Sequence, residues 1–189
     1  MALGKETDEE VMNSIHLKSE RLHLKPINIS DLEAIHELHS LPETDEFNAL
    51  GIPKNIEQTQ AIVEQWISEN QKEDNQIFTF TITVKNQFVG LIALNLGKER
   101  YQNAEIWYKL HIDFWNKGYA TEALKTIINF GFNQLKLHRI GAGCAVGNIG
   151  SVRVLEKVGM TLEGRKRQNL PLKTGWSDNF EFAILSSEL

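Results

Sequence analysis

Apolar and polar residues follow two different rhythms along this chain, which together predict a series of strands interrupted by helices. Strict alternation is clearest in I-F-T-F-T-I-T-V, residues 77–84, where every second side chain is large and apolar. Such alternation is typical of a half-buried β-strand. The same pattern, with turn residues as boundaries, predicts seven strands. They are residues 19–27, 77–84, 88–96, 103–112, 138–146, 160–172 and 176–185.

Four segments repeat their apolar residues every three or four positions, which is typical of amphipathic helices. They are residues 30–41, 57–70, 117–135 and 149–158. Ser30, with Glu33 three positions later, fits a capping box at the first helix, and Gly159 fits a C-cap after the last. Residues 41–53 read as a loop bounded by prolines, and residues 1–14 as frayed or weakly helical. The order β-α-α-β-β-β-α-β-α-β-β predicts one mixed α/β layer structure, not separate domains.

The composition is that of an ordinary soluble globular protein, with 41% apolar and 24% charged residues among 189. This length favours a single domain over residues 1–189, with a core at about 19–185. No apolar run approaches the roughly 20 residues that span a bilayer. The start M-A-L-G-K-E-T-D-E-E does not fit a signal peptide, so we expect no membrane partner and a cytoplasmic location. The net charge of −5 disfavours nucleic acid as a direct partner and is compatible with a cationic substrate.

Neither the cysteine nor the histidines indicate a metal or redox centre. Cys144 is the single cysteine and lies in a predicted apolar strand, so we expect a buried, inert thiol. His36 and His39 are three positions apart on a predicted helix, and no third ligand accompanies them. Two histidines alone make a poor zinc site, so a solvated helix face is the better interpretation and no metal is expected.

The segment D-F-W-N-K-G-Y-A-T-E-A, residues 113–123, joins a predicted strand to a predicted helix. Amides in the first turn of a helix have no partner within it and lie at the positive end of its dipole. Because Gly118 and Ala120 are small, an anion can reach those amides, and the turn predicts a phosphate site built from backbone. It matches neither G-x-x-x-x-G-K-[ST] nor G-x-G-x-x-G. Taken alone, it also fits a helix start with small packing residues.

Two motifs together identify a family. The run W-N-K-G-Y-A-T-E-A resembles the pyrophosphate-binding turn [QR]-x-x-G-x-[GA] of the GNAT acyltransferases, with Trp115 in place of Gln or Arg. Ribosomal-protein N-acetyltransferases of this superfamily often have Trp there and continue G-K-G-Y-A-T-E-A. Downstream, G-N-I-G-S-V-R-V-L-E-K-V-G-M resembles the family's N-x-x-S-x-x-x-x-E-K-x-G-[FM]. The element order agrees from about residue 19 to 185. The resemblance implies a mixed seven-stranded sheet, a V-shaped splay between the fourth and fifth strands, and about four flanking helices.

The resemblance also implies a binding path for acetyl-CoA, with no metal. The pantetheine arm would lie along the fourth strand, where an N–H near Leu110 would stabilise the developing oxyanion. Lys117 would add a point charge, or is simply solvated, while Trp115 and Tyr119 fit core packing as well as cofactor contact. Asn148 would bind the pantetheine arm or only cap its helix. The expected cofactor-binding residues are Leu110, Ile112, Lys117, Gly118, Tyr119, Ala120, Thr121 and Asn148.

Two residues are candidates for proton transfer. The family's fourth strand often carries Glu at the position of Glu105, which would take the proton from the amine, or is an exposed strand residue paired across the sheet. The family's usual general acid, a Tyr seven residues after the Asn, is replaced by Leu155. Ser151 stands where related ribosomal-protein acetylases have a serine proposed to serve the leaving thiolate, or it only satisfies backbone in the first helical turn.

The acceptor is the least determined part of this interpretation. In the family, its site is walled by the loop near Phe47 and Asn48 and by the last two strands. Trp176, Asp178 and Glu181 lie there and could meet a cation, or are exposed hairpin residues. The resemblance favours an N-acetyltransferase that modifies a primary amine, above all a protein N-terminus such as that of a ribosomal protein. A polyamine or aminoglycoside enzyme and a non-catalytic acetyl-CoA sensor are the alternatives, and the chain is expected to be a monomer or homodimer.

Overall fold

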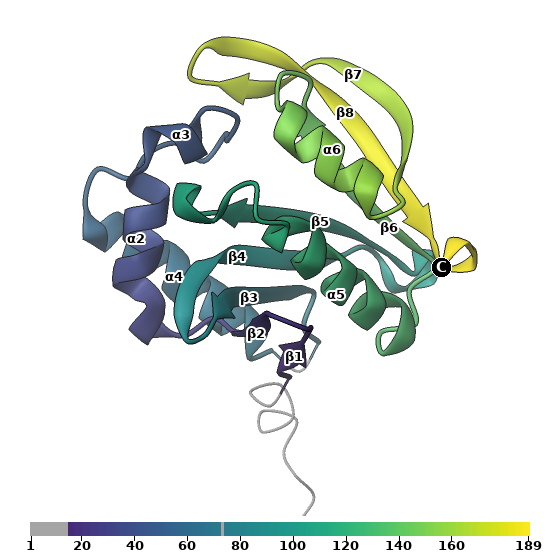
Figure 1. Cartoon of the computed structure of the whole chain (residues 1–189), viewed down its shortest axis with the longest axis horizontal. Coiled ribbons are helices and arrows are strands. Elements are labelled where there is room, and N and C mark those ends of the chain that lie inside the picture. Colours follow the sequence, from purple (N-terminus) through teal and green to yellow (C-terminus); the bar gives the residue numbers. More distant parts are fainter. Residues whose placement is uncertain (1–14, 73) are drawn as a thin grey trace, which may run out of the picture.

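One mixed β-sheet, covered by helices on both faces, forms the frame of the molecule in the computed structural model, which describes residues 15–72 and 74–189 (Figure 1). The expectation for residues 1–14 therefore lies outside the described residues. The strand order is β1-β2-β3-β4-β5-β6-β8-β7. The strands are β1 (Leu17–Lys18), β2 (His23–Pro26), β3 (Ile77–Val84), β4 (Gln87–Leu96), β5 (Asn103–Leu110), β6 (Arg139–Ala145), β7 (Thr161–Leu172) and β8 (Gly175–Leu185).

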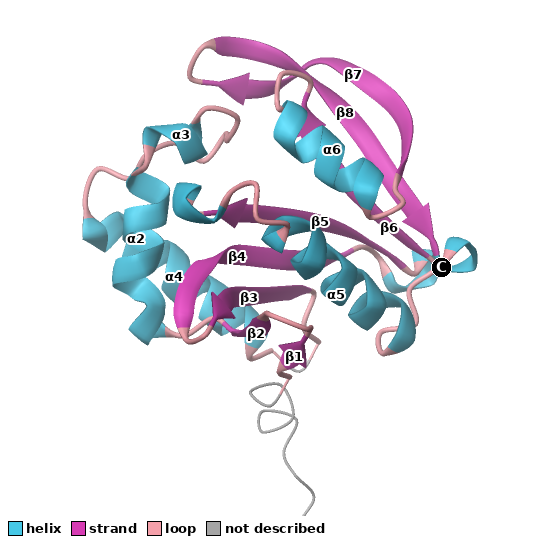
Figure 2. Cartoon of the chain, viewed as in Figure 1, coloured by secondary structure: helices cyan, strands magenta, loops and turns pink. Residues whose placement is uncertain are grey.

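The described residues contain five α-helices and four short 3₁₀ turns, whereas about four helices were expected (Figure 2). The additional helix, α3, lies in the segment 41–53 that the prolines marked as loop. Pro42 stands in its first turn, where a missing N–H costs nothing. The helices are α2 (Leu32–Ser40), α3 (Pro42–Asp45), α4 (Ile56–Asn70), α5 (Tyr119–Asn133) and α6 (Ile149–Lys157), and the 3₁₀ turns are η1 (Ile29–Asp31), η2 (Glu99–Tyr101), η3 (Ile112–Phe114) and η4 (Ser186–Glu188).

The predicted first strand, residues 19–27, is wrong in its extent, and the sheet has eight strands, not seven. The chain forms β1, turns sharply, and pairs antiparallel with itself as β2. Ser19 makes this turn, because its N–H donates to the Leu22 carbonyl at 3.0 Å and its Oγ accepts from the Leu22 N–H at 3.0 Å. A polar residue that closes a tight turn locally divides an alternating pattern into two short strands.

The capping box expected at Ser30 and Glu33 is also wrong, because it forms earlier in the chain. Asn28 accepts from the Ser30 N–H at 3.0 Å, and Asp31 accepts from the Asn28 N–H at 3.2 Å. The chain enters η1 before α2, so the first unpaired amides belong to that turn. The box fixes the direction in which α2 leaves β2.

Two apolar clusters hold the helices against opposite faces of the sheet. The larger lies between the sheet and α5, where Leu124, Ile127 and Ile128 are almost fully buried. The smaller cluster joins α2 and α4 to the other face through residues such as Leu38 and Val63. Because side chains alternate along a strand, those of β5 point in turn to the two faces of the sheet. Ala104, Ile106, Tyr108 and Leu110 face α5, and Glu105, Trp107 and Lys109 face α2 and α4.

The splay expected between the fourth and fifth strands is confirmed, and it lies between β5 and β6. These are the one parallel pair among the described strands, and the pairing covers only Asn103–Glu105 with Arg139–Gly141. Beyond Glu105 the two strands diverge, with α6 on the far side of the opening (Figure 1). Parallel neighbours are joined by a crossover helix, here α5, which begins beside the open end of the V.

Candidate functional site

The turn before α5 presents free backbone amides, as its sequence predicted. Gly118 is the N-cap of α5 with a φ of +79°, a left-handed conformation that glycine adopts without strain. No side chain caps this helix, and the first bond of its ladder runs from the Glu122 N–H to the Gly118 carbonyl at 3.0 Å. A Cβ on Gly118 would meet only the Arg21 guanidinium, 3.4 Å away. The amides of Tyr119, Ala120 and Thr121 are therefore available to an anion such as a pyrophosphate.

A network that the sequence did not reveal holds this turn in place. The Glu122 carboxylate accepts from the Ser19 hydroxyl at 2.6 Å, the Arg21 N–H at 2.8 Å and the Arg21 Nε at 2.6 Å. Arg21 also donates to the Lys117 carbonyl at 3.1 Å, and its guanidinium lies 4.6 Å from the centroid of the Tyr119 ring. Burial would raise the pKa of Glu122, but these hydrogen bonds outweigh it and lower that pKa. Charge and hydrogen bonding thus fix the turn to the β1–β2 hairpin.

Lys117 and Tyr119 have structural contacts of their own. The Lys117 ammonium lies over the Phe114 ring, 5.6 Å from its centroid. The Tyr119 ring packs at 6.1 Å from that of Phe114 and borders the larger apolar cluster. Both contacts leave the backbone of the turn exposed to a ligand.

The end of β5 directs one amide into the splay. His111 donates its N–H to the Val89 carbonyl at 2.9 Å, and Leu110 stands opposite Gly90. Because bonding directions alternate in an antiparallel ladder, the Leu110 N–H and carbonyl point away from β4, toward the open V. The Leu110 carbonyl accepts from the Trp115 indole at 2.8 Å, so Trp115 joins the phosphate turn to the strand end.

Ile112 lies elsewhere than expected. It belongs to the 3₁₀ turn η3, not to the strand, because the chain leaves the sheet after Leu110. The strand edge along which a pantetheine arm could add therefore ends at Leu110.

The N-terminus of α6 closes the same side of the splay. Asn148 caps this helix by accepting from the Ser151 N–H at 3.0 Å, which is the second of the two roles considered for it. The Ser151 side chain lies against the Tyr108 hydroxyl, which has no hydrogen-bond partner of good geometry among the described residues. Burial raises the pKa of Tyr108 to about 12. Burial, and then the charge of Glu181, raises the pKa of Cys144 to about 11, so this buried cysteine is a neutral thiol as expected.

Glu105 lies on the opposite face of the sheet from Ser151, at the base of the V. Its carboxylate rests on Gly141, where a Cβ would collide with it. Partial desolvation, and then the negative charge of Glu181, raises the pKa of Glu105. Glu105 forms no ion pair or hydrogen bond with other described residues, whereas Glu181 pairs with Lys166 at 3.1 Å and accepts from Asn179 at 2.7 Å. A carboxylate of raised pKa beside an open cleft suits proton transfer.

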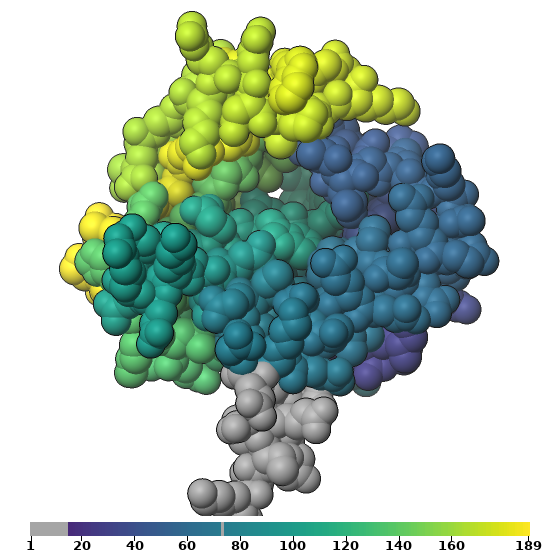
Figure 3. Space-filling model, turned by 180° about the vertical axis from the view of Figure 1, so that it is seen from behind, coloured from purple at the N-terminus to yellow at the C-terminus, as the bar shows by residue number. Residues whose placement is uncertain are grey.

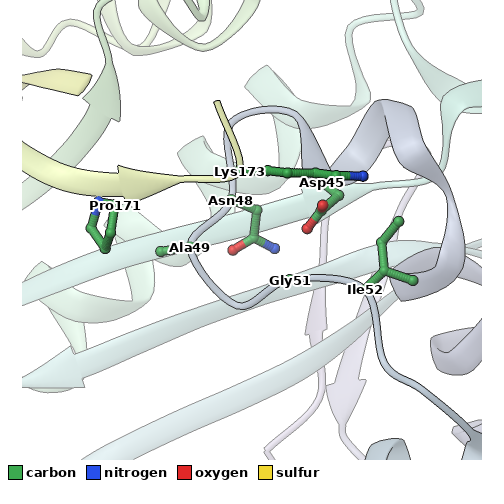
Figure 4. Close-up of a pocket in the computed structure, with 7 residues that line it drawn as sticks. All are labelled: Asp45, Asn48, Ala49, Gly51, Ile52, Pro171 and Lys173. Carbon is green, nitrogen blue, oxygen red and sulfur yellow. The ribbon is translucent and has the colours of Figure 1, made fainter. Parts of the chain in front are cut away.

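The expected walls of the acceptor site meet around a cavity of about 300 Å³ (Figure 4). The last residue of α3 and the loop after it supply Asp45, Asn48 and Ile52, and the β7–β8 hairpin supplies Pro171 and Lys173. Seen from behind, the surface is hollowed between the yellow-green hairpin and the blue and teal segments (Figure 3).

The residues proposed for the hairpin wall differ in their surroundings. Asp178 is paired with Arg165 at 2.6 Å and accepts from the Gln168 N–H at 2.8 Å, so it stabilises the hairpin itself. Trp176 is 66% exposed and stands opposite Pro171 in the hairpin. On the other wall, the Phe47 ring lies close to the Cα of Gly147, which brings the loop up to the start of α6.

With this geometry in place, comparisons with known proteins identify the family. The sequence model described as an acetyltransferase (GNAT) domain matches residues 21–161. The chain belongs to the GNAT acetyltransferase family. It is 29% identical to the uncharacterized N-acetyltransferase YnaD of Bacillus subtilis over 177 residues, which are 92% of this chain and 99% of YnaD. A GNAT-family acetyltransferase structure from Bacillus anthracis superposes with a TM-score of 0.81 at 31% identity, covering 92% of this chain and 100% of that one.

Two further GNAT structures share the fold at lower identity. RimL, a ribosomal L7/L12 α-N-protein acetyltransferase solved with coenzyme A, has a TM-score of 0.82 at 21% identity and covers 90% of this chain and 98% of its own. The spermidine N-acetyltransferase of Vibrio cholerae, solved with coenzyme A and spermine, has a TM-score of 0.79 at 21% identity with the same coverages, 90% and 98%. The chain is therefore a GNAT N-acetyltransferase that uses acetyl-CoA as its co-substrate.

The free amides at Gly118, the Leu110 N–H directed into the V and the unpartnered Tyr108 hydroxyl all fit acetyl-CoA. Among residues 15–72 and 74–189, no group of three or more His, Cys, Asp or Glu is arranged to hold a metal ion. The solvated helix face expected at His36 and His39 is wrong, because His36 bonds to Thr59 at 2.8 Å and His39 is buried against Trp66. No helix in the same part of the chain is long and apolar enough to cross a membrane.

Sequence reasoning missed three polar residues of the site: Tyr108, Lys109 and Asp45. Tyr108 and Lys109 lie in A-E-I-W-Y-K-L, directly before the oxyanion candidate Leu110. Alternation could have placed them on opposite faces of that strand. Asp45 gave no signal, because its importance comes from contacts with segments far away in the sequence.

Proposed function

We propose that this GNAT enzyme transfers the acetyl group of acetyl-CoA to a primary amine, and that this amine is the N-terminus of a protein such as a ribosomal protein. The observation that carries the proposal is the placement of Glu105 and Ser151 on opposite faces of the sheet at one splay. An amine can approach from the α2 and α4 face while the thiol leaves on the α5 and α6 face.

Each of the residues around the splay then has a separate role in the reaction. Acetyl-CoA supplies an acetyl group activated as a thioester. The amides of Tyr119, Ala120 and Thr121 hold its phosphates, and the Leu110 N–H donates to the carbonyl oxygen as negative charge develops there. A well-placed donor of this kind is worth about 3–4 kcal/mol. Lys117 adds a positive charge at the edge of the phosphate turn.

The two protons are handled on opposite faces. Glu105, whose raised pKa makes it a stronger base than an ordinary surface carboxylate, takes the proton that the ammonium loses, directly or through water. Ser151, beside the Tyr108 hydroxyl, donates a hydrogen bond to the departing sulfur and relays to it the second proton that the nitrogen loses. One N–C bond forms and one C–S bond breaks, so the products are an amide and a free thiol.

A protein N-terminus is supported by the resemblance of G-Y-A-T-E-A and Trp115 to ribosomal-protein acetylases, and by the likeness of the fold to RimL. The acceptor cavity is also open along the hollow between the hairpin and the loop after α3, which leaves room for an extended peptide (Figure 3). Acetylation in the compartment where ribosomes assemble would place the enzyme in the cytoplasm.

The deciding experiment compares protein N-termini in cells with and without the enzyme by mass spectrometry, beside an in vitro panel of peptides, polyamines and aminoglycosides with acetyl-CoA. We expect one or a few N-termini to lose acetylation, and the matching peptides to be acetylated fastest. Rapid acetylation of a polyamine with no change at any N-terminus would refute the protein substrate. Binding of acetyl-CoA without turnover of any amine would indicate a sensor.

A further inference from the structure

Three buried polar side chains without hydrogen-bond partners lie between α2, α3 and the end of β5. His39 is 2% exposed, Asp45 is 5% exposed and Lys109 is 9% exposed. The His39 Nδ1, the Asp45 Oδ1 and the Lys109 Nζ find no partner among the described residues. Because unpaired buried polar atoms cost free energy, a group of them in one place indicates that something else completes their bonding.

These three groups are close enough to act on one another's charge. Burial lowers the pKa of Lys109 to about 8, against the opposing attraction of the Asp45 carboxylate. Burial, and then the positive charge of Lys109, lowers the pKa of His39 to about 4. His39 is therefore neutral at physiological pH, and Asp45 and Lys109 are the charged members of the group. The Asp45 carboxylate and the Lys109 ammonium attract each other, but neither the Asp45 Oδ1 nor the Lys109 Nζ has a hydrogen-bond partner among the described residues.

The group adjoins the acceptor cavity on one side and the splay on the other. Asp45 is part of the cavity wall, together with the loop 48–52 and the hairpin residues Pro171 and Lys173 (Figure 4). Lys109 directly precedes Leu110, the end of the strand that opens the V. A molecule that fills the cavity thus lies beside the place where the acetyl group is transferred.

We propose that this cavity binds a primary alkylammonium group of the acceptor, distinct from the amine that is acetylated, and that the Asp45 carboxylate accepts its hydrogen bonds. This inference rests on the proposed function and narrows its substrate class to acceptors that carry a second positive charge. A cavity of about 300 Å³ has room for about ten waters, which is enough for an ammonium and several methylene groups.

The carboxylate in the cavity wall favours a cation over an anion at this position. Asp45 is the one acidic residue that lines the cavity, and its buried Oδ1 has no partner among the described residues, whereas Glu43 and Glu46 are exposed and lie outside the lining. Lys109 is buried and is not part of the cavity lining. Lys173 reaches across the cavity from the exposed hairpin, and its long side chain can leave toward solvent when another ammonium enters (Figure 4).

The test compares linear diamines of two to six carbons with amino alcohols of the same length, in which a hydroxyl replaces the second amine. We expect the best diamine to exceed its amino alcohol at least about tenfold in kcat/KM, as for loss of a hydrogen bond to a charged group. Asp45→Asn should remove this preference while keeping the shape of the wall. Glu46→Gln, an exposed neighbour on the same helix, should keep it, and Lys173→Met should increase it.

Peptide acceptors show whether the second ammonium belongs to a peptide or to a polyamine. Peptides that begin Ala-Lys and Ala-Met have similar length and differ in charge. If the natural acceptor is a protein N-terminus, the Lys peptide should show the same Asp45-dependent preference, whereas a preference confined to diamines points to a polyamine. Equal rates for diamines and amino alcohols, or a preference that survives Asp45→Asn, would overturn the proposal. So would faster acetylation of an ω-amino acid, since that places an anion in the cavity.

Binding separates this inference from the proposed function. If no amine is acetylated, the proposed function is wrong, and the cavity can still be examined by thermal unfolding with coenzyme A present. A diamine that binds the folded protein raises Tm. A rise in wild type that is absent in Asp45→Asn supports the ammonium site, and no rise with any diamine refutes it.

Discussion

The Glu122 carboxylate carries the clearest prediction about stability, because one side chain fixes the phosphate turn to the start of the sheet. It is 16% exposed and accepts from the Ser19 hydroxyl, the Arg21 N–H and the Arg21 guanidinium, all within 2.8 Å. Glu122→Ala removes every one of these bonds. Glu122→Gln keeps one oxygen acceptor but loses the charge.

The expected magnitude follows from the exposure of each partner. Hydrogen bonds to a charged group contribute about 1.5–3 kcal/mol each, and those from Ser19 and the Arg21 N–H belong to this class. The Arg21 guanidinium is 44% exposed, so solvent screening reduces its share to roughly 0.2–1 kcal/mol. With the lower end of that range for the two charged hydrogen bonds, Glu122→Ala should cost about 3–4 kcal/mol, and Glu122→Gln about 1–2 kcal/mol. At about 2–4 °C per kcal/mol for a protein of this size, Glu122→Ala should lower Tm by about 6–16 °C.

Thermal unfolding, followed by circular dichroism or calorimetry, measures these shifts. Glu163→Ala is a matched control, since Glu163 accepts two hydrogen bonds from Arg139 but is 47% exposed and distant from the turn. It should cost less than about 1 kcal/mol. If Glu122→Ala costs no more than Glu163→Ala, the network does not hold the turn, and this reasoning is wrong.

The hydrogen bonds to Glu122 should also make the stability of the protein depend on pH. The folded-state pKa of Glu122 lies below its usual value of 4.5, so the ionised carboxylate contributes stability that is complete above about pH 4.5. That contribution is lost as pH falls through the lowered pKa, because protonation removes the charge that the donors stabilise. Glu122→Gln should remove this part of the acid sensitivity. Because Arg21 also bonds to the Lys117 carbonyl, we further expect KM for acetyl-CoA to rise in both variants.

Three other predictions concern the V and its surroundings. Gly118→Val should abolish protection of the protein by coenzyme A in thermal unfolding, since valine disfavours the φ of +79° and covers the free amides; retained affinity would place the phosphate site elsewhere. Glu105→Gln should lower kcat/KM about 10²-fold, most strongly at low pH, and Ser151→Ala should lower kcat with little change in acetyl-CoA binding. If both variants keep near-full activity across the pH range, neither residue is catalytic, and the enzyme works by positioning and by the Leu110 N–H alone. Lys109→Met should stabilise the protein at pH 7 by roughly 1–3 kcal/mol, because it removes a buried charge. In wild type, stability should rise from about pH 8 to 10.5, because the buried amine loses its proton at a lower pH in the folded state than in the unfolded state, and Lys109→Met should remove this rise. Denaturant unfolding at a series of pH values measures both effects, and an unchanged pH profile would show that the amine is solvated.

The sequence by itself determined the elements whose signals are local. The strand at 77–84 has the predicted bounds, because strict alternation between Thr and large apolar residues is a period that only a strand satisfies. The turn at Gly118 was readable because a glycine before a helical pattern limits both conformation and bulk. The two motifs then indicated the family, and with it the splay of the sheet.

Predictions from local sequence patterns were wrong where two patterns in the same segment favoured different structures. The alternation in residues 19–27 masked the turn that Ser19 closes, so one strand was predicted where two exist. Asn28 and Ser30 are both good caps, and only the path of the chain out of β2 selects Asn28. Ile112 continued an apolar pattern, but the strand ends at Leu110, where the chain turns toward the helix and Trp115 holds the last carbonyl.

Only the tertiary structure decided the chemistry of the acceptor side. Asp45, Lys109 and Lys173 are separated by more than sixty residues in sequence, and no periodicity relates them. Packing buries Asp45 and Lys109, which strengthens charge interactions and leaves polar atoms without water, and it brings the exposed Lys173 to the same cavity as Asp45. The same holds for Glu105, whose pKa is raised by a neighbouring strand and by Glu181 across the splay. Packing brings these groups into one low-dielectric place, and the order of residues along the chain does not encode that proximity in any local pattern.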